Sequence, residues 1–147
     1  MKNLILKELN SVLNEKIVLL KKAIDQAVES RDLETKSSAG DKHETSRAII
    51  QREIDQLASQ LKKNETLKHQ LTKVDLFKNH QLIDFGSIVE TNNGTYFLAI
   101  GWGKITISNK AVFCISLASP IGKQLYKKET GDQFDFQKKK FIVKNVI

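Results

Sequence analysis

The chain has 147 residues, of which 40% are hydrophobic and 28% charged, and its formal net charge is +7. This length suits one ordinary domain, or a small domain that carries an extension. The single cysteine, Cys114, excludes an internal disulfide and a zinc site built from several cysteines, and its apolar neighbours favour a small buried side chain over a reactive thiol. No apolar run approaches the roughly 18 residues of a membrane span, and the charged N-terminus lacks the features of a signal peptide. We therefore expect a cytoplasmic protein with no membrane contact.

Two long helices are predicted in the first half of the chain, because apolar residues recur there at alternating steps of four and three. Residues 3–31 and 42–74 contain neither Gly nor Pro, whereas the small polar residues of 32–42 interrupt the pattern and form a predicted tip. Asp41 is the expected N-cap of the second helix, with Glu44 completing a capping box. The two ladders are Leu6, Asn10, Leu13, Ile17, Leu20, Ile24, Ala27, Arg31 and His43, Arg47, Ile50, Ile54, Leu57, Leu61, Asn64, Lys68.

The ladders predict an antiparallel coiled-coil hairpin within one chain. If the chain folds back at Ser37, residues whose numbers add to about 74 come level, as the seam of an antiparallel pair requires. One rung is then polar, and a buried Asn pair discriminates against slipped registers. Towards the tip, Arg31 would face His43, so the seam becomes polar there. The predicted rungs are Ile24 with Ile50, Leu20 with Ile54, Ile17 with Leu57, Leu13 with Leu61, and Asn10 with Asn64.

The composition changes near residues 75–80. All seven Phe, both Tyr and the only Trp follow Leu76. The period of the pattern changes to that of strands, with a hairpin turn at residues 92–94 and a short helix at 119–128 that begins with Ser119 as N-cap and Pro120 as its first residue. The sequence therefore predicts an α+β protein, with an antiparallel helical hairpin over 1–76 and, over 77–147, a small antiparallel sheet with one short helix. The expected strands lie near 86–91, 95–100, 104–107, 111–115, 133–137 and 140–146.

The two parts also differ in charge. Residues 1–76 carry 14 basic and 12 acidic side chains, whereas residues 77–147 carry 10 basic and 5 acidic ones. A basic excess of this kind indicates either an anionic partner or simple solubility, and composition leaves both open.

The segment Ile-Ser-Leu-Ala-Ser-Pro-Ile-Gly-Lys-Gln-Leu at residues 115–125, followed by Gly-Asp at 131–132, resembles the Gre transcription-cleavage factors of bacterial RNA polymerase. In that family, this helix and turn belong to an FKBP-like C-terminal domain that follows an antiparallel helical hairpin. The resemblance implies that the C-terminal domain docks at the rim of the polymerase secondary channel, with Ser119, Pro120 and Ile121 as contact candidates. It also implies indirect contact with the RNA and DNA of the elongation complex. We expect a monomer.

The resemblance further implies an accessory factor that is not itself an enzyme and has no cofactor of its own. The hairpin of the family carries tip carboxylates into the polymerase active site, where they help hold a second Mg²⁺ and a water that hydrolyses a backtracked transcript. The family tip reads Asp-Leu-Lys-Glu-Asn, and this chain departs from it. The first candidates are Asp41 and Glu44, which would hold Mg²⁺ only within the polymerase; Asp32 and Glu34 are the second, with one residue fewer between the acids.

Several alternatives stay open at this stage. Asp41 and Glu44 could simply cap a helix, and an alignment that starts from Arg47 would instead place Lys36 and Ala39 at the acidic positions. A factor with these departures could occupy the channel and modulate polymerase without stimulating cleavage. An independent enzyme such as a prolyl isomerase would need an aromatic pocket, for which the candidates are residues that a core also needs, namely Tyr96, Phe97, Trp102 and Phe113.

Overall fold

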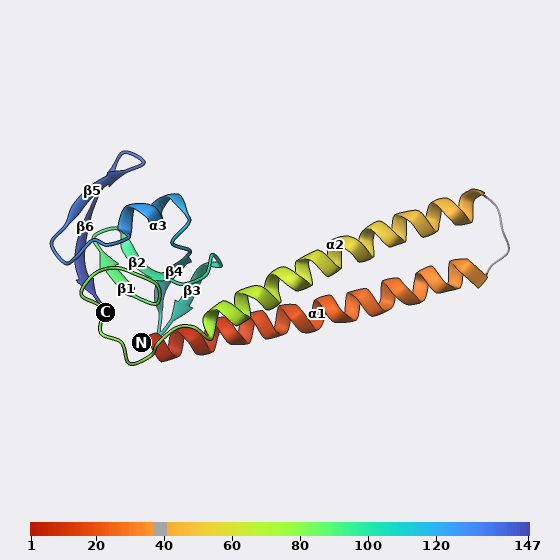
Figure 1. The fold of residues 1–147 in the computed structure, drawn as a ribbon, viewed down its shortest axis with the longest axis horizontal. Helices are drawn as coiled ribbons and strands as arrows, with labels where there is room; N and C mark the ends of the chain where they lie inside the picture. The colour runs from red at the N-terminus through yellow and green to blue at the C-terminus, as the bar shows by residue number, and fades with distance from the viewer. Residues whose placement is uncertain (37–40) are drawn as a thin grey trace. The chain divides into compact units, whose positions relative to one another are not determined.

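The computed structural model describes residues 1–36 and 41–147, and the side chains of residues 1–34 and 44–147. Two long helices precede six strands and one short helix, which confirms the predicted α+β class (Figure 1). The elements are α1 (Lys2–Lys36), α2 (Asp41–Leu71), β1 (Ile88–Thr91), β2 (Gly94–Leu98), β3 (Gly103–Ile107), β4 (Lys110–Ile115), α3 (Pro120–Leu125), β5 (Gln133–Phe136) and β6 (Lys139–Val146).

The chain forms two compact units. The sheet unit comprises Met1–Leu9 and His69–Ile147, and the helical unit comprises Asn10–Lys68. Helix α1 runs through both without a break, so the first residues of the chain belong with the last ones. The division into domains at residues 76 and 77 stays a prediction.

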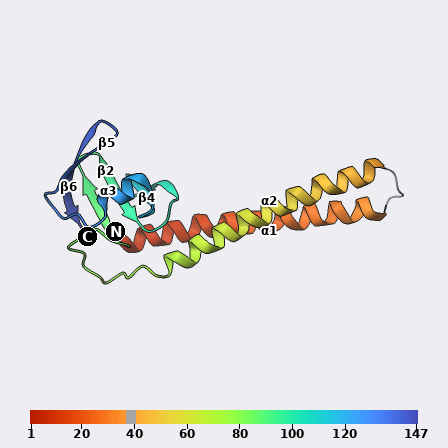
Figure 2. The same cartoon turned by 45° about the horizontal axis from the view of Figure 1, so that its top comes forward.

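In the helical unit, α1 and α2 run side by side in opposite directions, as two turned views also show (Figures 1 and 2). Among the described side chains of this unit, the buried ones all come from the two predicted ladders: Leu13, Ile17, Leu20, Ala27, Ile54 and Asn64. The buried polar position is satisfied within its own helix, because Asn64 Nδ2 donates to the Gln60 carbonyl oxygen at 2.8 Å. The individual rungs of the seam stay predictions.

Helix α1 extends five residues beyond its predicted end at residue 31, so Asp32 and Glu34 lie in a helix and not in a loop. The physical reason is that residues 32–36 contain no Gly or Pro to stop the helix. Arg31 lies between the helices, as the ladder predicts, but its Nη1 donates to Gln51 Oε1 at 2.9 Å. Because side chains in a helix generally lean towards its N-terminus, residues of two antiparallel helices that are not level can meet. The predicted partner, His43, lies outside the described side chains.

The start of α1 is buried more deeply than the ladder predicts. Ile5 and Leu9 have no exposed surface, whereas the ladder residue Leu6 is only half-buried. Lys2 is also buried, and its Nζ donates to the carbonyl oxygen of Lys78 at 3.4 Å. The predicted ladder considered only the contact with a second helix, whereas the first turns of α1 belong to the sheet unit.

The sheet has the strand order β3-β4-β2-β1-β6-β5. Three hairpins and the β1–β6 pair are antiparallel, but β2 and β4 pair in parallel, so the prediction of a wholly antiparallel sheet is wrong at this pair. The connection after β2 carries the chain past β4, since Ala99 N donates to Ile115 O at 3.0 Å and Trp102 N donates to Cys114 O at 3.1 Å. The β3–β4 hairpin therefore returns with β4 next to β2 and β3 outside it.

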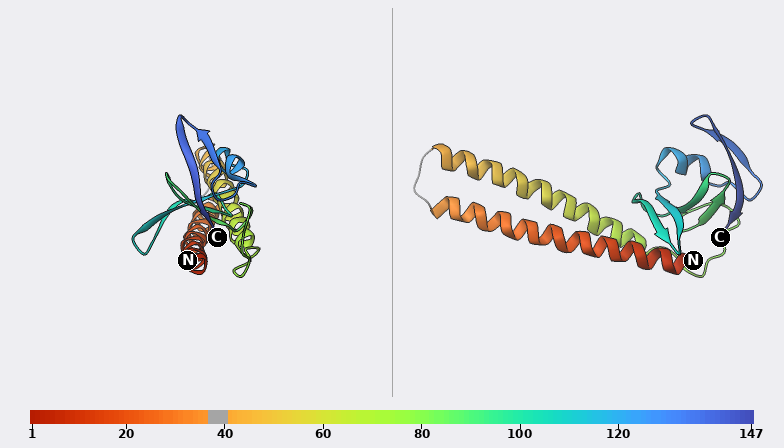
Figure 3. Two further views of the ribbon diagram at one scale, coloured as in Figure 1. Left: turned by 90° about the vertical axis from the view of Figure 1, so that its left-hand side faces the viewer. Right: turned by 180° about the vertical axis from the view of Figure 1, so that it is seen from behind.

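Both faces of the central strands are buried. Helix α3 lies over one face of the sheet (Figure 3). The core cluster on this face comprises Ile83, Val89, Tyr96, Leu98, Leu125, Phe141 and Val143. The alternate residues, including Phe97 and Cys114, are buried on the other face. Burial raises the pKa of the Cys114 thiol to about 12, so this cysteine is structural, as predicted. Within the described residues, no helix has the length and apolar character needed to cross a membrane.

Candidate functional site

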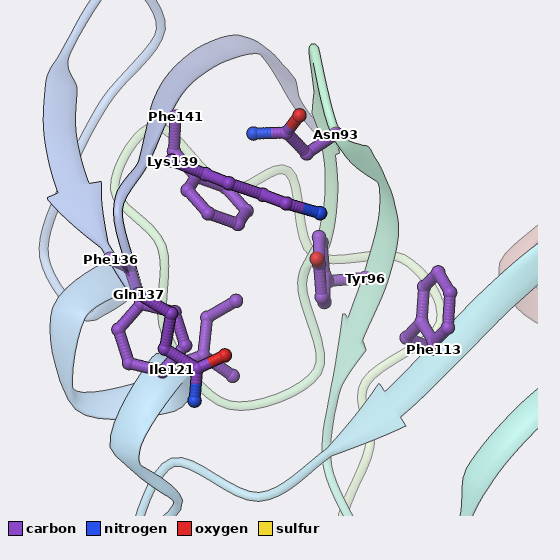
Figure 4. Close-up of a pocket in the computed structure, with 8 residues that line it drawn as sticks. All are labelled: Asn93, Tyr96, Phe113, Ile121, Phe136, Gln137, Lys139 and Phe141. Atoms are coloured by element: carbon purple, nitrogen blue, oxygen red, sulfur yellow. The ribbon is translucent and has the colours of Figure 1, made fainter.

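A pocket of about 360 Å³ opens in the sheet unit between α3, β2, β4 and the β5–β6 hairpin (Figure 4). Four aromatic rings and one isoleucine form its apolar wall, and three exposed polar side chains complete the lining. The lining residues are Asn93, Tyr96, Phe113, Ile121, Phe136, Gln137, Lys139 and Phe141.

The rings of the pocket support one another. The Tyr96 ring centroid lies 5.5 Å from that of Phe113 and 6.3 Å from that of Phe141. Phe136 meets Phe141 edge to face at 6.2 Å, and Phe134 stacks behind Phe141 at 5.0 Å. Because such packing fixes ring positions, the pocket is formed before any ligand arrives. Burial raises the pKa of Tyr96, so its hydroxyl remains a hydrogen-bond donor at neutral pH.

The β1–β2 turn is fastened to β6 beside the pocket. Asn92 Nδ2 donates to the Lys140 carbonyl oxygen at 2.9 Å, and Asn92 Oδ1 accepts from Ile142 N at 2.8 Å. Asn93 Nδ2 donates to the same Lys140 oxygen at 2.9 Å. The sequence predicted the turn itself correctly, but these two side chains also join strands that are distant in sequence.

The predicted contact residues lie at the start of α3. Ser119 is the N-cap, as predicted, because its Oγ accepts from Gly122 N at 3.1 Å while donating to Ser116 O at 2.7 Å. Pro120 is the exposed first residue of α3, and Ile121 is half-buried in the pocket wall. The three candidates therefore have three different positions: one in the cap, one on the surface and one in the pocket.

The aromatic residues of the pocket differ from those that the sequence suggested. Tyr96 and Phe113 do line it, but Phe97 is fully buried on the other face of the sheet, and Trp102 is not part of the lining. Phe136 and Phe141 were missed. The signal that could have found them is the alternation of apolar and polar residues on β5 and β6, which turns every second side chain to the same face.

The predicted tip carboxylates belong to the helical unit. Asp32 is exposed and accepts from Arg31 Nη2 at 3.4 Å, and Glu34 is half-exposed two residues later in α1. Residues two apart in a helix point about 200° from each other, so these two carboxylates do not converge. Glu44 is exposed in the first turn of α2, where the helix dipole favours a negative charge. Asp41 begins α2, one turn before Glu44, but its side chain lies outside those described.

A polar cluster in the sheet unit joins the buried ring of His80 to the half-exposed Asp84 and the exposed Lys78. His80 Nδ1 contacts Asp84 Oδ1, and Lys78 Nζ pairs with Asp84 Oδ2 at 2.8 Å. Burial lowers the pKa of His80, and the hydrogen bond to Asp84 only partly opposes it, so the ring is neutral at pH 7. Burial by itself would raise the pKa of Asp84, but the hydrogen bonds from Lys78 and His80 lower it. Among the described residues, no group of three His, Cys, Asp or Glu could hold a metal ion.

No protein-family model and no curated protein matches the sequence. One solved structure, described as "Structure of the transcription factor Gfh1", aligns with 93% of this chain and 92% of that chain, at 18% sequence identity and a TM-score of 0.38.

Proposed function

We propose that this chain is a Gre-like transcription factor that binds the secondary channel of RNA polymerase and stimulates cleavage of backtracked transcripts through acidic residues near the ends of its long helices. The observation that carries the proposal is the order of its parts, together with the sequence motif at α3. A pair of helices with 35 and 31 residues precedes a sheet unit whose short helix begins at Ser119-Pro120. At 1.5 Å per residue, the paired segments 10–36 and 41–68 are each about 40 Å long.

The sheet unit would supply the docking surface. The resemblance assigns rim contact to Ser119, Pro120 and Ile121. In this chain Pro120 is exposed at the start of α3, and the next residue, Ile121, helps to line the aromatic pocket. Apolar pockets with a few polar groups at the rim are typical binding sites. Because Ser119 Oγ is engaged within the cap, we assign its contribution to holding α3 in place.

The chemistry would take place in the polymerase and not in this chain. A hard cation such as Mg²⁺ prefers oxygen ligands, and two ions that clamp the attacking and leaving oxygens suit phosphodiester hydrolysis. Positions 41 and 44 are one helical turn apart, whereas Asp32 and Glu34 point in different directions along α1. We therefore favour Asp41 and Glu44 as the residues that complete the second Mg²⁺ site, with no cofactor bound by the chain alone.

The first experiment is a binding assay with purified core RNA polymerase. We expect the full chain to bind, and to compete with a backtracked RNA 3′ end for the secondary channel. A correctly folded sample that shows no binding would remove the proposed function and its alternative together.

The second experiment is transcript cleavage by stalled elongation complexes. Wild-type protein is expected to stimulate cleavage, and Asp41→Ala and Glu44→Ala are expected to lower the rate by about tenfold or more, because each removes a ligand oxygen. Glu53→Ala is the matched control, since Glu53 is an exposed acid in the middle of α2. Equal stimulation by Glu44→Ala and Glu53→Ala would show that Glu44 has no part in the reaction.

The alternative is a factor that occupies the same channel and modulates polymerase without stimulating cleavage. The divergence of Asp32 and Glu34 on α1 favours it, because the acids nearest to the family tip motif do not form a pair. The cleavage assay separates the two functions: binding of wild-type protein with no stimulation at any Mg²⁺ concentration would support the alternative.

A further inference from the structure

The side of α1 that is turned away from α2 carries exposed apolar side chains. Val18 and Leu19 are each 64% exposed in the middle of the helix, beside a shallow hollow. Successive helical residues turn by about 100°, so this pair points away from the buried ladder of α1, and α2 lies along the opposite side (Figure 1). Exposed apolar side chains that lie together mark interaction surfaces, whereas isolated ones do not. The hollow is lined by Asn14, Glu15, Val18 and Leu19.

One charge of each sign flanks this apolar pair. Glu15 lies one turn before it, Lys22 lies one turn after it, and both are exposed. Within the residues that the structure describes, neither of these two side chains makes an ion pair in the single chain. Both charges are therefore available to a partner. We call the set Glu15, Val18, Leu19 and Lys22 the outer face of α1.

The outer face is complementary to a second copy of itself. When two α1 helices lie antiparallel with a two-fold axis between Val18 and Leu19, residues whose numbers add to 37 come level. Val18 of each copy then meets Leu19 of the other, and Glu15 of each copy meets Lys22 of the other. A two-fold contact requires a patch that matches itself in this way. The apolar centre and two ion pairs would thus form together.

The same symmetry continues to both ends of the helix. Leu4 and Leu33, which are 48% and 61% exposed, are the other exposed large apolar residues of α1 among the described side chains. They are 29 residues apart, or about eight helical turns, so they point in the same direction as the outer face. Their numbers also add to 37, which would bring each against the other in a second copy. Glu8 and Glu29 would come level as well, and this repulsion weakens the contact.

The charges of this side of α1 favour a second copy over a membrane or a nucleic acid. Both of those partners are anionic and select helices with a basic polar face, whereas here three acids, Glu8, Glu15 and Glu29, accompany one base, Lys22. A contact one helix wide falls at the low end of interface areas. The association is therefore weak and depends on protein concentration.

We propose that two copies of this chain associate through the outer face of α1, in an antiparallel two-fold contact in which Glu15 of each copy pairs with Lys22 of the other. The observation that carries the proposal is the symmetry of α1 itself. Its four exposed large apolar residues and the two flanking charges are all placed symmetrically about the point between Val18 and Leu19. Such a dimer does not depend on the proposed function, and it differs from the monomer expected from the sequence.

Sedimentation equilibrium of the full chain measures the association. We expect a monomer–dimer equilibrium with a dissociation constant between about 1 µM and 1 mM, as a small interface implies. The double variant Val18→Gln/Leu19→Gln should raise this constant about tenfold or more, because it removes the apolar centre. Ile49→Gln is the matched control, since Ile49 is 59% exposed on α2 and lies outside the outer face. It should change the constant less than about twofold.

Two results of this measurement would overturn the proposal. One is a wild-type chain that stays monomeric up to about 1 mM. The other is an equal effect of the double variant and Ile49→Gln. Thermal unfolding followed by circular dichroism, measured at a concentration where the chain is monomeric, should be the same for wild type and variants, because the substituted side chains are exposed.

Charge reversals test the antiparallel geometry. Glu15→Lys and Lys22→Glu should each weaken the dimer about tenfold, since each places two like-charged pairs in the contact. An equimolar mixture of these two variants should restore association, because the two lysines of one chain then face the two glutamates of the other. The variant that carries both reversals should restore it as well. A mixture that associates no better than either variant alone would overturn the pairing of Glu15 with Lys22.

The binding assay with core polymerase distinguishes this proposal from the proposed function. A monomeric wild-type chain, combined with weaker polymerase binding by Val18→Gln/Leu19→Gln, would overturn the second copy as the occupant and assign the outer face to the polymerase. Dimerisation as expected, combined with no binding of the wild-type chain to polymerase, would instead support the dimer and remove the proposed function.

Discussion

The sheet unit and the helical unit differ in how their candidate functional residues relate to the residues that stabilise each unit. In the sheet unit, Tyr96 and Phe141 belong both to the hydrophobic core and to the pocket wall. In the helical unit, the buried residues such as Leu13 and Ile17 are distinct from the exposed acids Asp32 and Glu44. Substitutions in the pocket wall are therefore expected to change stability as well, whereas substitutions of the exposed acids are not.

The largest expected loss of stability comes from substitution of Gly122, where the absence of a side chain lets α3 pack closely against the preceding segment. A Cβ at this position would lie 2.1 Å from the Ser116 carbonyl oxygen and 2.8 Å from Ser119 Oγ. Because backbone cannot move aside easily, Gly122→Ala should lower the free energy of unfolding by about 3 kcal/mol or more. Urea denaturation followed by the fluorescence of Trp102, the only tryptophan, measures it in the sheet unit.

The control for this change is Gly101→Ala, because no atom lies within 4 Å of a Cβ built there. We expect its stability to stay within about 0.5 kcal/mol of wild type. If Gly122→Ala were as stable as Gly101→Ala, α3 would not be held in the way that we describe.

The next prediction compares the loss of stability caused by a Leu→Ala substitution in each of the two units. Leu98 is fully buried in the sheet, whereas Leu61 is half-buried in α2. Leu98→Ala should therefore cost about 3 kcal/mol and Leu61→Ala about 1 kcal/mol, since the loss grows with the buried area and the cavity left behind. Far-ultraviolet circular dichroism, which α1 and α2 dominate, and Trp102 fluorescence report on the two units in one titration. Equal losses of stability in the two variants would contradict the difference in packing between the two units.

A smaller loss is expected where the β1–β2 turn joins β6. Asn92→Ala removes two side-chain hydrogen bonds, to Lys140 O and from Ile142 N, and should cost about 1–2 kcal/mol. Asn93→Ala removes one such bond and should cost about half as much. Denaturation of the two variants side by side checks this order. A reversed order would mean that Asn92 is only a turn residue, as its sequence context suggests.

The helical part and most strands could be predicted because their signals are local. The ladder that contains Leu13, Ile17 and Leu20 predicts buried positions on α1, since one helix face repeats every three to four residues. The Ser119-Pro120 start of α3 also follows from local chemistry. Even the misplaced end of α1 is an error of a few residues at a helix terminus, where boundaries are least determined by local sequence.

The pocket could not be predicted, because it depends on contacts between distant segments. Phe113 reaches it only because β4 pairs in parallel with β2, and this order depends on how the chain crosses after residue 98. Phe141 reaches it because β6 returns beside β1. The deep burial of Ile5 likewise depends on the grouping of the first turns of α1 with the sheet. Periodicity identifies which face of an element is apolar, but not which other element covers it.

The His80 cluster makes the sheet unit sensitive to acid. Burial lowers the pKa of His80 in the folded state, below the 6.5 of an exposed histidine, so the unfolded chain binds more protons between these two values. The stability that His80 contributes is therefore complete above pH 6.5 and decreases as the pH falls below it. The opposing charges around the ring are Asp84, which favours protonation, and Lys2 and Lys78, which disfavour it. Urea denaturation at a series of pH values above the titration range of Asp84 measures this slope.

Two histidine variants test whether His80 causes this pH dependence. His80→Asn should flatten the slope between pH 6.5 and the acidic range, because the titrating group is gone. His69→Asn is the control for the substitution itself, since His69 is exposed on α2. A slope that persists in His80→Asn would assign the acid sensitivity to another group.

The smallest expected change in stability is at the acids of the helical unit, and it is the sharpest test of the comparison. Glu44 is exposed, and the exposed Asp32 accepts from Arg31 at 3.4 Å, so replacement of either by Ala should change the free energy of unfolding by less than about 0.5 kcal/mol. If Glu44 acts in the polymerase, the same Glu44→Ala protein would fold normally, bind polymerase with wild-type affinity and yet fail to stimulate cleavage. Tyr96→Ala, by contrast, should lose stability and binding together, because one ring serves the core and the pocket. A Glu44→Ala variant that unfolds early, or a Tyr96→Ala variant of unchanged stability, would contradict the separation of roles between the two units.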